Sequence, residues 1–135
     1  MNIRCIHNPH AGFNRKKPHL PAAIRRFIAA HGLDARLVST EYPMHATSLA
    51  WQAVGEGCDL VVAVGGDGLM NEVAQALLHS SATLGLIPCG SGNGLARHLQ
   101  VPLRLDAALA ALLTGRPRAL DTVMANGQPF FCAMG

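Results

Sequence analysis

The stretch Leu60-Val61-Val62-Ala63-Val64-Gly65-Gly66-Asp67-Gly68 decides the fold of this chain of 135 residues. Its first five residues are all apolar, which is typical of a parallel strand that is covered on both faces of its sheet. Two glycines end the strand, and apolar residues then recur at helical spacing from Met70 to Leu78. A buried strand, a glycine-rich turn and an amphipathic helix together predict one βα unit.

Short apolar runs and helical stripes alternate along the rest of the chain. The run from Ile3 to Ile6 predicts a first strand, which ends at Asn8-Pro9. Apolar and polar residues alternate over 33–37, as in a half-exposed or edge strand, and 84–87 form another apolar run. Three further amphipathic helices are predicted, over Leu20–Ile28, Ala46–Val54 and Leu105–Leu113. In the second of these helices we expect Trp51 to pack in the core.

Alternating strands and helices form βαβ units with right-handed crossovers. We therefore predict an α/β fold with an open, mostly parallel sheet and helices on both of its faces. The C-terminal end differs, because the strand-like run 119–124 is followed by the hairpin turn Asn126-Gly127 and by a return strand that begins at Phe130-Phe131-Cys132. We expect residues 1–124 to form the main domain, with a second domain beginning at 125–135. Exposed aromatic rings at Phe130 and Phe131 would favour a homodimer.

The composition limits the partners that this chain is suited to bind. Half of the residues are hydrophobic, 14% are charged, and the formal net charge is only +3, with dispersed basic residues that do not indicate nucleic-acid binding. Four cysteines without a close pair predict buried thiols in a reducing compartment, and the seven histidines lack metal-ligand spacing. No apolar run is long enough to span a membrane, so we expect a cytoplasmic protein.

Three glycine-bearing loops follow predicted strands. They are Asn8-Pro9-His10-Ala11-Gly12, Gly65-Gly66-Asp67-Gly68 and Pro88-Cys89-Gly90-Ser91-Gly92-Asn93-Gly94. In open α/β sheets ligands bind beyond the carboxyl ends of the strands, and glycines let backbone N–H groups approach phosphate oxygens. One such loop usually serves only the geometry of a turn, but three at strand ends favour a phosphate-binding site.

Two familiar phosphate-binding motifs are absent. A P-loop requires Gly-Lys-Ser/Thr, and the chain contains no Gly-Lys pair. Gly90 and Gly92 begin a Rossmann fingerprint, but Leu95 stands where the third glycine is required. Neither motif therefore accounts for these loops.

Asp67 is the candidate catalytic residue. It lies between two glycines directly after the buried strand, at the edge where ligands bind. An aspartate at this point also suits the N-cap of the following helix, and the two interpretations are compatible.

Several blocks of sequence together resemble the diacylglycerol kinase and sphingosine kinase superfamily. These blocks are Asn8-Pro-x-x-Gly12, Gly65-Gly-Asp-Gly68 with Asn71-Glu72, and Pro88-x-Gly-Ser-x-Asn93. Thr40 followed by His45-Ala46 resembles a further block, and Asn126-Gly127-x-x-Phe130 resembles the crossing into the second domain. The resemblance extends over essentially the whole chain.

The resemblance implies an ATP- and Mg²⁺-dependent kinase that transfers the γ-phosphate to the hydroxyl of a diacylglycerol or a sphingoid-type lipid. Residues 1–124 are implied to be the ATP-binding catalytic domain, and 125–135 the first hairpin of a β-rich lipid-binding domain. Asp67 is implied to lie near the γ-phosphate and Mg²⁺, either as general base or as a metal-holding group. Because the lipid is presented at a membrane surface, contact with the inner membrane face is implied for a cytoplasmic protein. The residues implied to line the ATP site are Asn8, Pro9, His10, Ala11, Gly12, Thr40, Gly65, Gly66, Asp67, Gly68, Leu69, Met70, Asn71, Ser91 and Asn93.

The chain departs from the family pattern at three positions. Many members have threonine in place of Leu69, aspartate in place of Gly94 and glycine in place of Met44. The sequence around Leu69 and Gly94 resembles that of sphingosine and ceramide kinases more closely, so the identity of the lipid substrate stays open. Two alternatives remain, an enzyme similar to NAD kinase and a nucleotide-binding module without catalysis. With only the first hairpin of the second domain, we expect the chain to bind nucleotide but not to complete the reaction alone.

Overall fold

The computed structural model describes residues 2–9, 19–78, 80–89, 94–98, 100–114, 120–125 and 128–133. Within them lies a sheet of four parallel strands, in the order β2-β1-β3-β4. This is the predicted open parallel sheet, and its strands are β1 (Asn2–His7), β2 (Asp34–Ser39), β3 (Leu60–Gly65) and β4 (Thr83–Pro88).

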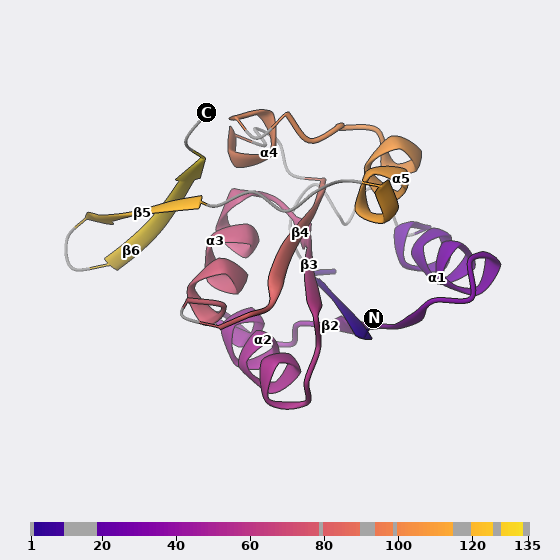
Figure 1. The fold of residues 1–135 in the computed structure, drawn as a ribbon, viewed down its shortest axis with the longest axis horizontal. Coiled ribbons are helices and arrows are strands. Elements are labelled where there is room, and N and C mark those ends of the chain that lie inside the picture. Colours follow the sequence, from indigo (N-terminus) through magenta and orange to yellow (C-terminus); the bar gives the residue numbers. More distant parts are fainter. Residues whose placement is uncertain are drawn as a thin grey trace.

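Helices cover both faces of this sheet, as predicted. Figure 1 shows α1 (Leu20–Ala30) and α5 (Leu105–Thr114) on one side of the strands and α2 (His45–Gly55) and α3 (Asp67–Ala76) on the other. The short helix α4 (Gly94–His98) lies next to α3. None of the helices in the described segments combines the length and the apolar composition that crossing a bilayer requires.

The continuous apolar run of β3 is explained by two separate core clusters. Val61 and Ala63 pack with α2 and α3, whereas Val62 and Val64 pack with α1 and α5. Successive side chains of a strand point to opposite faces, so a strand buried on both sides needs an apolar residue at every position. The predicted reason for the run Leu60–Val64 is thus confirmed.

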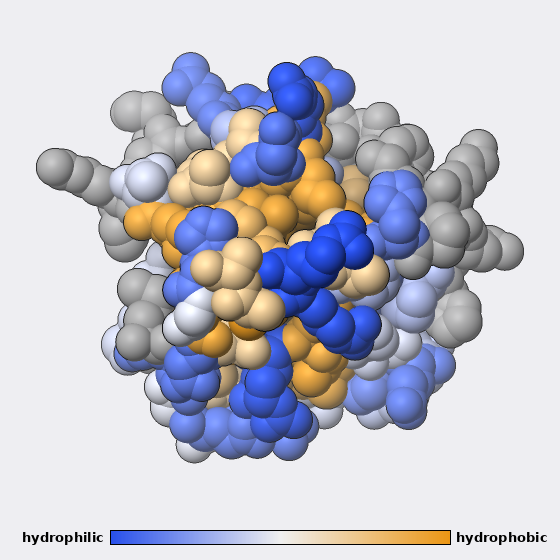
Figure 2. All heavy atoms as spheres, turned by 90° about the vertical axis from the view of Figure 1, so that its right-hand side faces the viewer, coloured by the Kyte–Doolittle hydropathy of each residue, from blue (hydrophilic) through white to orange (hydrophobic). Residues whose placement is uncertain are grey.

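Figure 2 shows the face of the molecule that α1 and α5 cover, with apolar atoms gathered near its centre among hydrophilic ones. Partly buried apolar residues of both helices pack on the core of this face, among them Phe27, Ile28 and Leu112. The apolar stripes predicted for these two helices therefore do face the sheet.

Helix α2 packs through small residues, and the expectation for Trp51 is wrong. Ala46, Ala50 and Ala53 are fully buried, whereas the Trp51 side chain is 62% exposed. Alanines let the helix lie close to the sheet, and Trp51 projects from a different side of the helix. A large apolar residue in a helix does not by itself indicate burial.

Strand β2 is an edge strand, as its alternating pattern predicted. Among the described strands it pairs with β1 alone, and the half-buried Ala35 and Leu37 alternate with the exposed Asp34 and Arg36. The α1–β2 connection turns through Gly32, whose φ of +59° lies in the left-handed region that favours glycine.

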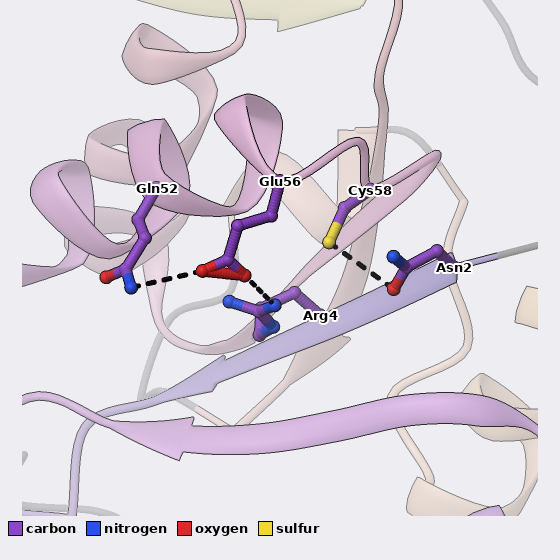
Figure 3. Close-up of polar contacts among 5 residues, drawn as sticks. All are labelled: Asn2, Arg4, Gln52, Glu56 and Cys58. Atoms are coloured by element: carbon purple, nitrogen blue, oxygen red, sulfur yellow. Dashed lines mark hydrogen bonds and ion pairs between the residues drawn. The ribbon is translucent and has the colours of Figure 1, made fainter.

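A polar network joins β1 to the end of α2 on the opposite side of the sheet from α1 (Figure 3). The buried Arg4 donates from Nη2 to Oε2 of Glu56 over 2.6 Å, and Gln52 Nε2 donates to Oε1 of the same carboxylate over 3.2 Å. Near the amino end of β1, the Cys58 thiol contacts Oδ1 of Asn2. The Arg4 hydrogen bond is the main reason why the pKa of Glu56 lies below its usual value.

The last two strands form a separate antiparallel hairpin. Strand β5 (Leu120–Ala125) pairs with β6 (Gln128–Ala133), as the turn signal predicted, and β6 lies near α3 and α4 (Figure 1). The turn residues Asn126 and Gly127 and the side chains of Phe130 and Phe131 lie outside the described residues. The proposed domain boundary at 124/125 and the homodimer therefore stay predictions.

Candidate functional site

The carboxyl ends of all four parallel strands meet at one edge of the sheet, where the glycine-bearing loops begin. Two backbone hydrogen bonds continue across this edge. The Thr40 N–H donates to the His7 carbonyl over 2.9 Å, and the Cys89 N–H donates to the Gly65 carbonyl over 3.0 Å. Asn8 directly follows β1 at the same edge. The structure thus brings the predicted residues Asn8, Thr40 and Gly65 to a common edge.

The turn from β3 into α3 is built on two glycines. Gly65 is buried at the end of the strand, and Gly66 is the N-cap residue, with φ −96° and ψ −170°. The Gly66 carbonyl accepts the first helical hydrogen bond, from the Met70 N–H over 3.0 Å. Asp67 is accordingly the first residue inside the helix, and the interpretation of Asp67 as the N-cap is wrong.

The Asp67 carboxylate links the second glycine loop to the third. Its side chain is exposed, and Oδ2 accepts a hydrogen bond from the Gly94 N–H over 2.8 Å. A carboxylate in the first turn of a ten-residue helix also interacts favourably with the partial positive charge of that end. Asp67 therefore presents an anchored negative charge at the sheet edge where the predicted loops begin.

Asn71 lies one helical turn beyond Asp67, on the same side of α3. Its side-chain Oδ1 is buried and has no hydrogen-bond partner among the described residues. Buried polar atoms without a partner are uncommon and require an explanation. An amide oxygen and a carboxylate on the same side of a helix are ligands that suit a hydrated Mg²⁺ ion. Such an ion binds one or two carboxylates together with phosphate oxygens.

Two of the predicted site residues have buried side chains. Leu69 and Met70 are 8% and 0% exposed and belong to the core beneath α2 and α3. Their side chains fix the position of the helix, so only their backbone groups remain for a ligand. Gly68, by contrast, is exposed in the first turn of α3.

Five predicted residues lie outside the described part of the chain. They are the loop residues His10, Ala11, Gly12, Ser91 and Asn93. Pro9 is described and follows Asn8 at the end of β1.

His7 is a residue of this edge that the sequence analysis missed. It ends β1 with only 2% exposure, and neither ring nitrogen has a hydrogen-bond partner among the described residues. Burial is the main reason why the pKa of His7 lies below its ordinary value, and the charge of Arg25 on α1 adds to this effect. The only signal in the sequence that could have pointed to His7 was a titratable residue at the end of the first predicted strand.

Metal ligands of other kinds do not gather elsewhere among the described residues. No group of three or more histidine, cysteine, aspartate or glutamate side chains in those segments is arranged to hold a metal ion.

Several known proteins similar to this chain are diacylglycerol kinases. The family model of the diacylglycerol kinase catalytic domain matches residues 2–125. The diacylglycerol kinase of Bacillus subtilis (strain 168) is 38% identical over 98% of this chain, and that of Staphylococcus aureus (strain bovine RF122 / ET3-1) is 33% identical over 94%. The chain spans only 44% and 41% of those two proteins, respectively.

The fold is similar to that of a solved relative. The crystal structure of a diacylglycerol kinase from Bacillus anthracis str. Sterne superposes with a TM-score of 0.81 and 30% sequence identity. The match covers 96% of this chain and 45% of that one. On this evidence of sequence and fold, the chain belongs to the diacylglycerol kinase catalytic domain family.

Proposed function

We propose that this chain is the nucleotide-binding part of an ATP- and Mg²⁺-dependent lipid kinase. The observation that supports the proposal most strongly is the Asp67 carboxylate, anchored at the carboxyl edge of the parallel sheet where three glycine-bearing loops begin. Membership of the diacylglycerol kinase catalytic domain family supports phosphoryl transfer to a lipid alcohol. The acceptor would be the hydroxyl of a diacylglycerol or a sphingoid-type lipid presented at a membrane surface.

Phosphoryl transfer depends mainly on positioning and on neutralising the charge of the phosphates. Backbone N–H groups of Gly66–Gly68 are suited to bind phosphate oxygens, because a glycine turn and the start of α3 present them at the edge where Asn8 and Thr40 also lie. Asp67 and Asn71 would hold Mg²⁺ or its water shell. The ion would supply neutralisation of the charge on the β- and γ-phosphates.

Asp67 has a second role open to it, that of a general base. A carboxylate within hydrogen-bond reach of the acceptor hydroxyl removes its proton as the bond to phosphorus forms. The two roles differ in their effect on ground-state binding, because only a cation-holding group strengthens the binding of Mg·ATP. We favour the cation role, since Asp67 is exposed beside the buried acceptor of Asn71.

A paired measurement on wild type and Asp67→Asn tests the proposal. Isothermal titration gives the affinity for Mg·ATP, and a single-turnover assay on the enzyme that contains this domain gives the rate towards a lipid alcohol in vesicles. Asp67→Asn is expected to weaken Mg·ATP binding about tenfold, as loss of a charge-assisted interaction implies, and to slow turnover by about two to four orders of magnitude.

Asp34→Asn is the matched control, because Asp34 is an exposed aspartate at the opposite, amino edge of the sheet. It should bind Mg·ATP as the wild type does. An Asp67→Asn variant with unchanged affinity and unchanged rate would refute both roles of Asp67. A slow variant with unchanged affinity would identify the general base instead of the cation-holding group.

A further inference from the structure

The contact between Asp67 and Gly94 joins two loops that are 27 residues apart in sequence. Gly94 is the first residue of α4, and Asp67 is the first residue of α3. The hydrogen bond runs from a backbone N–H to a carboxylate oxygen, and hydrogen bonds to a charged acceptor are stronger than neutral ones. The backbone of the third loop therefore contributes to the direction in which the carboxylate points.

The position of the donor is fixed by packing. Ala96, in α4, is fully buried in the core cluster that also contains Leu69 and Met70. The Val101 N–H donates to the Ala96 carbonyl over 2.8 Å, which closes the C-terminal end of α4. Because α4 is packed on α3 in this way, the Gly94 N–H is held at a constant place beside Asp67.

Residue 94 lies directly against the carboxylate. A Cβ atom on Gly94 would stand 3.2 Å from Oδ2 and 3.9 Å from Oδ1 of Asp67. A side chain at this point would have to displace the carboxylate by a few tenths of an ångström. A shift of that size would leave the hydrogen bond from the N–H of residue 94 in place.

We propose that the backbone N–H of Gly94 is a positioning group, which holds Oδ2 of Asp67 so that the carboxylate meets the cation of a Mg·nucleotide in a fixed orientation. This inference rests on the proposed function. It assigns to the loop after β4 a role in cation binding in addition to any contact of that loop with phosphate. A fixed carboxylate loses less conformational freedom on binding than one that must first be oriented.

Two substitutions at Gly94 separate the N–H group from the rest of the residue. Gly94→Pro removes the donor at the first position of a helix, where proline is tolerated, and the φ of Gly94 is not in the left-handed region. Gly94→Ala retains the donor and adds only the Cβ atom. Circular dichroism and thermal unfolding establish that each variant is folded.

The binding probe is ADP, titrated by calorimetry with Mg²⁺ and again with excess EDTA. Gly94→Pro should weaken binding of Mg·ADP about tenfold and leave binding of metal-free ADP within about threefold, whereas Gly94→Ala should stay within about threefold in both. The double variant Gly94→Pro/Asp67→Asn should bind Mg·ADP no more weakly than Asp67→Asn alone, because Gly94→Pro acts through the Asp67 carboxylate, which the second change has already removed.

A spectroscopic readout works without nucleotide. In ¹H–¹⁵N spectra of the apo chain, Asp67→Asn should move the Gly94 amide proton upfield and speed its exchange with solvent. This measurement shows whether the Gly94 N–H donates to Asp67 even if Gly94→Pro does not fold. An unchanged Gly94 resonance would overturn the inference.

The outcomes also distinguish the inference from the proposed function. If Asp67→Asn weakens Mg·ADP binding but a folded Gly94→Pro does not, the positioning role of Gly94 is wrong and the cation role of Asp67 stands. If neither variant changes binding of Mg·ADP, the cation role of Asp67 fails, and the positioning role fails with it.

Discussion

Gly65 and Leu69 lie so close together that a Cβ atom on Gly65 would stand 2.5 Å from Cδ2 of Leu69 and 3.1 Å from its Cβ. The strand β3 therefore enters α3 through a turn that has no room for a side chain at its first residue. Leu69 is itself buried in the core below α2 and α3, so it has little freedom to move away. This relationship is what sets Asp67 at the sheet edge.

Gly65→Ala should destabilise the chain by about 1–3 kcal/mol, the usual effect of forcing an extra methyl group into a packed core. Urea denaturation measures the change in free energy of unfolding. Gly68→Ala is the matched control, because no atom lies within 4 Å of its added Cβ and the residue is in the first turn of a helix. It should be neutral or stabilising by up to about 1 kcal/mol. Equal stability of the two variants would show that the turn is not packed as described.

The backbone conformation at Met44 explains why glycine would suit this position. Met44 precedes α2 with φ +66°, in the left-handed region, at the position where the family resemblance leads us to expect glycine. Its side chain is 56% exposed, so little packing is lost when it is removed. Met44→Gly should therefore stabilise the chain by about 1 kcal/mol, because glycine adopts positive φ without steric cost.

The control for this substitution is Met44→Ala, which retains a Cβ atom and the strain. It should leave stability within about 0.5 kcal/mol of wild type. If alanine stabilised as much as glycine, loss of the exposed side chain and not relief of backbone strain would be the cause.

The buried side chain of His7 should make the stability of the chain depend on pH. Its pKa in the folded chain is lowered from 6.5, first by burial and then by the charge of Arg25, so the unfolded chain binds the proton more tightly. Stability is fully present above pH 6.5 and is lost as the pH falls from 6.5 towards the folded pKa, by at most about 1.4 kcal/mol per pH unit. His7→Leu, of similar volume, should abolish this contribution and should also be more stable at pH 7 by about 1 kcal/mol.

Urea denaturation of wild type and His7→Leu from pH 5 to 8 measures the effect. The two stability curves should run parallel from pH 7 to 8 and diverge below pH 6.5, with wild type falling more steeply. Parallel curves throughout would mean that His7 does not titrate differently in the folded and unfolded chain.

The sequence predicted most of the fold because its signals are local. Three patterns each indicate which side chains of a short segment are buried. They are the unbroken apolar run in β3, the alternation in β2 and the apolar stripe of α1. The start of α3 was placed late, at Met70 in place of Asp67, because the first turn of that helix is polar and has no apolar period.

The site was predictable only as a set of loops at one edge. The contact from Gly94 to Asp67 depends on how α4 packs against α3, which a pattern of residues along the chain does not specify. The exposure of Trp51 was missed for a related reason, since the packed face of α2 is made of alanines that give only a weak periodic signal.

The central claim is that the carboxyl edge of the sheet binds the nucleotide, and a ¹H–¹⁵N titration of the chain with Mg·ATP tests it most directly. The amides of Asn8, Thr40, Gly66 and Asp67 should shift on addition of Mg·ATP, and those of Asp34 and Asp59 at the amino edge should not. Absence of any shift at millimolar Mg·ATP, or shifts confined to the amino edge, would contradict the account.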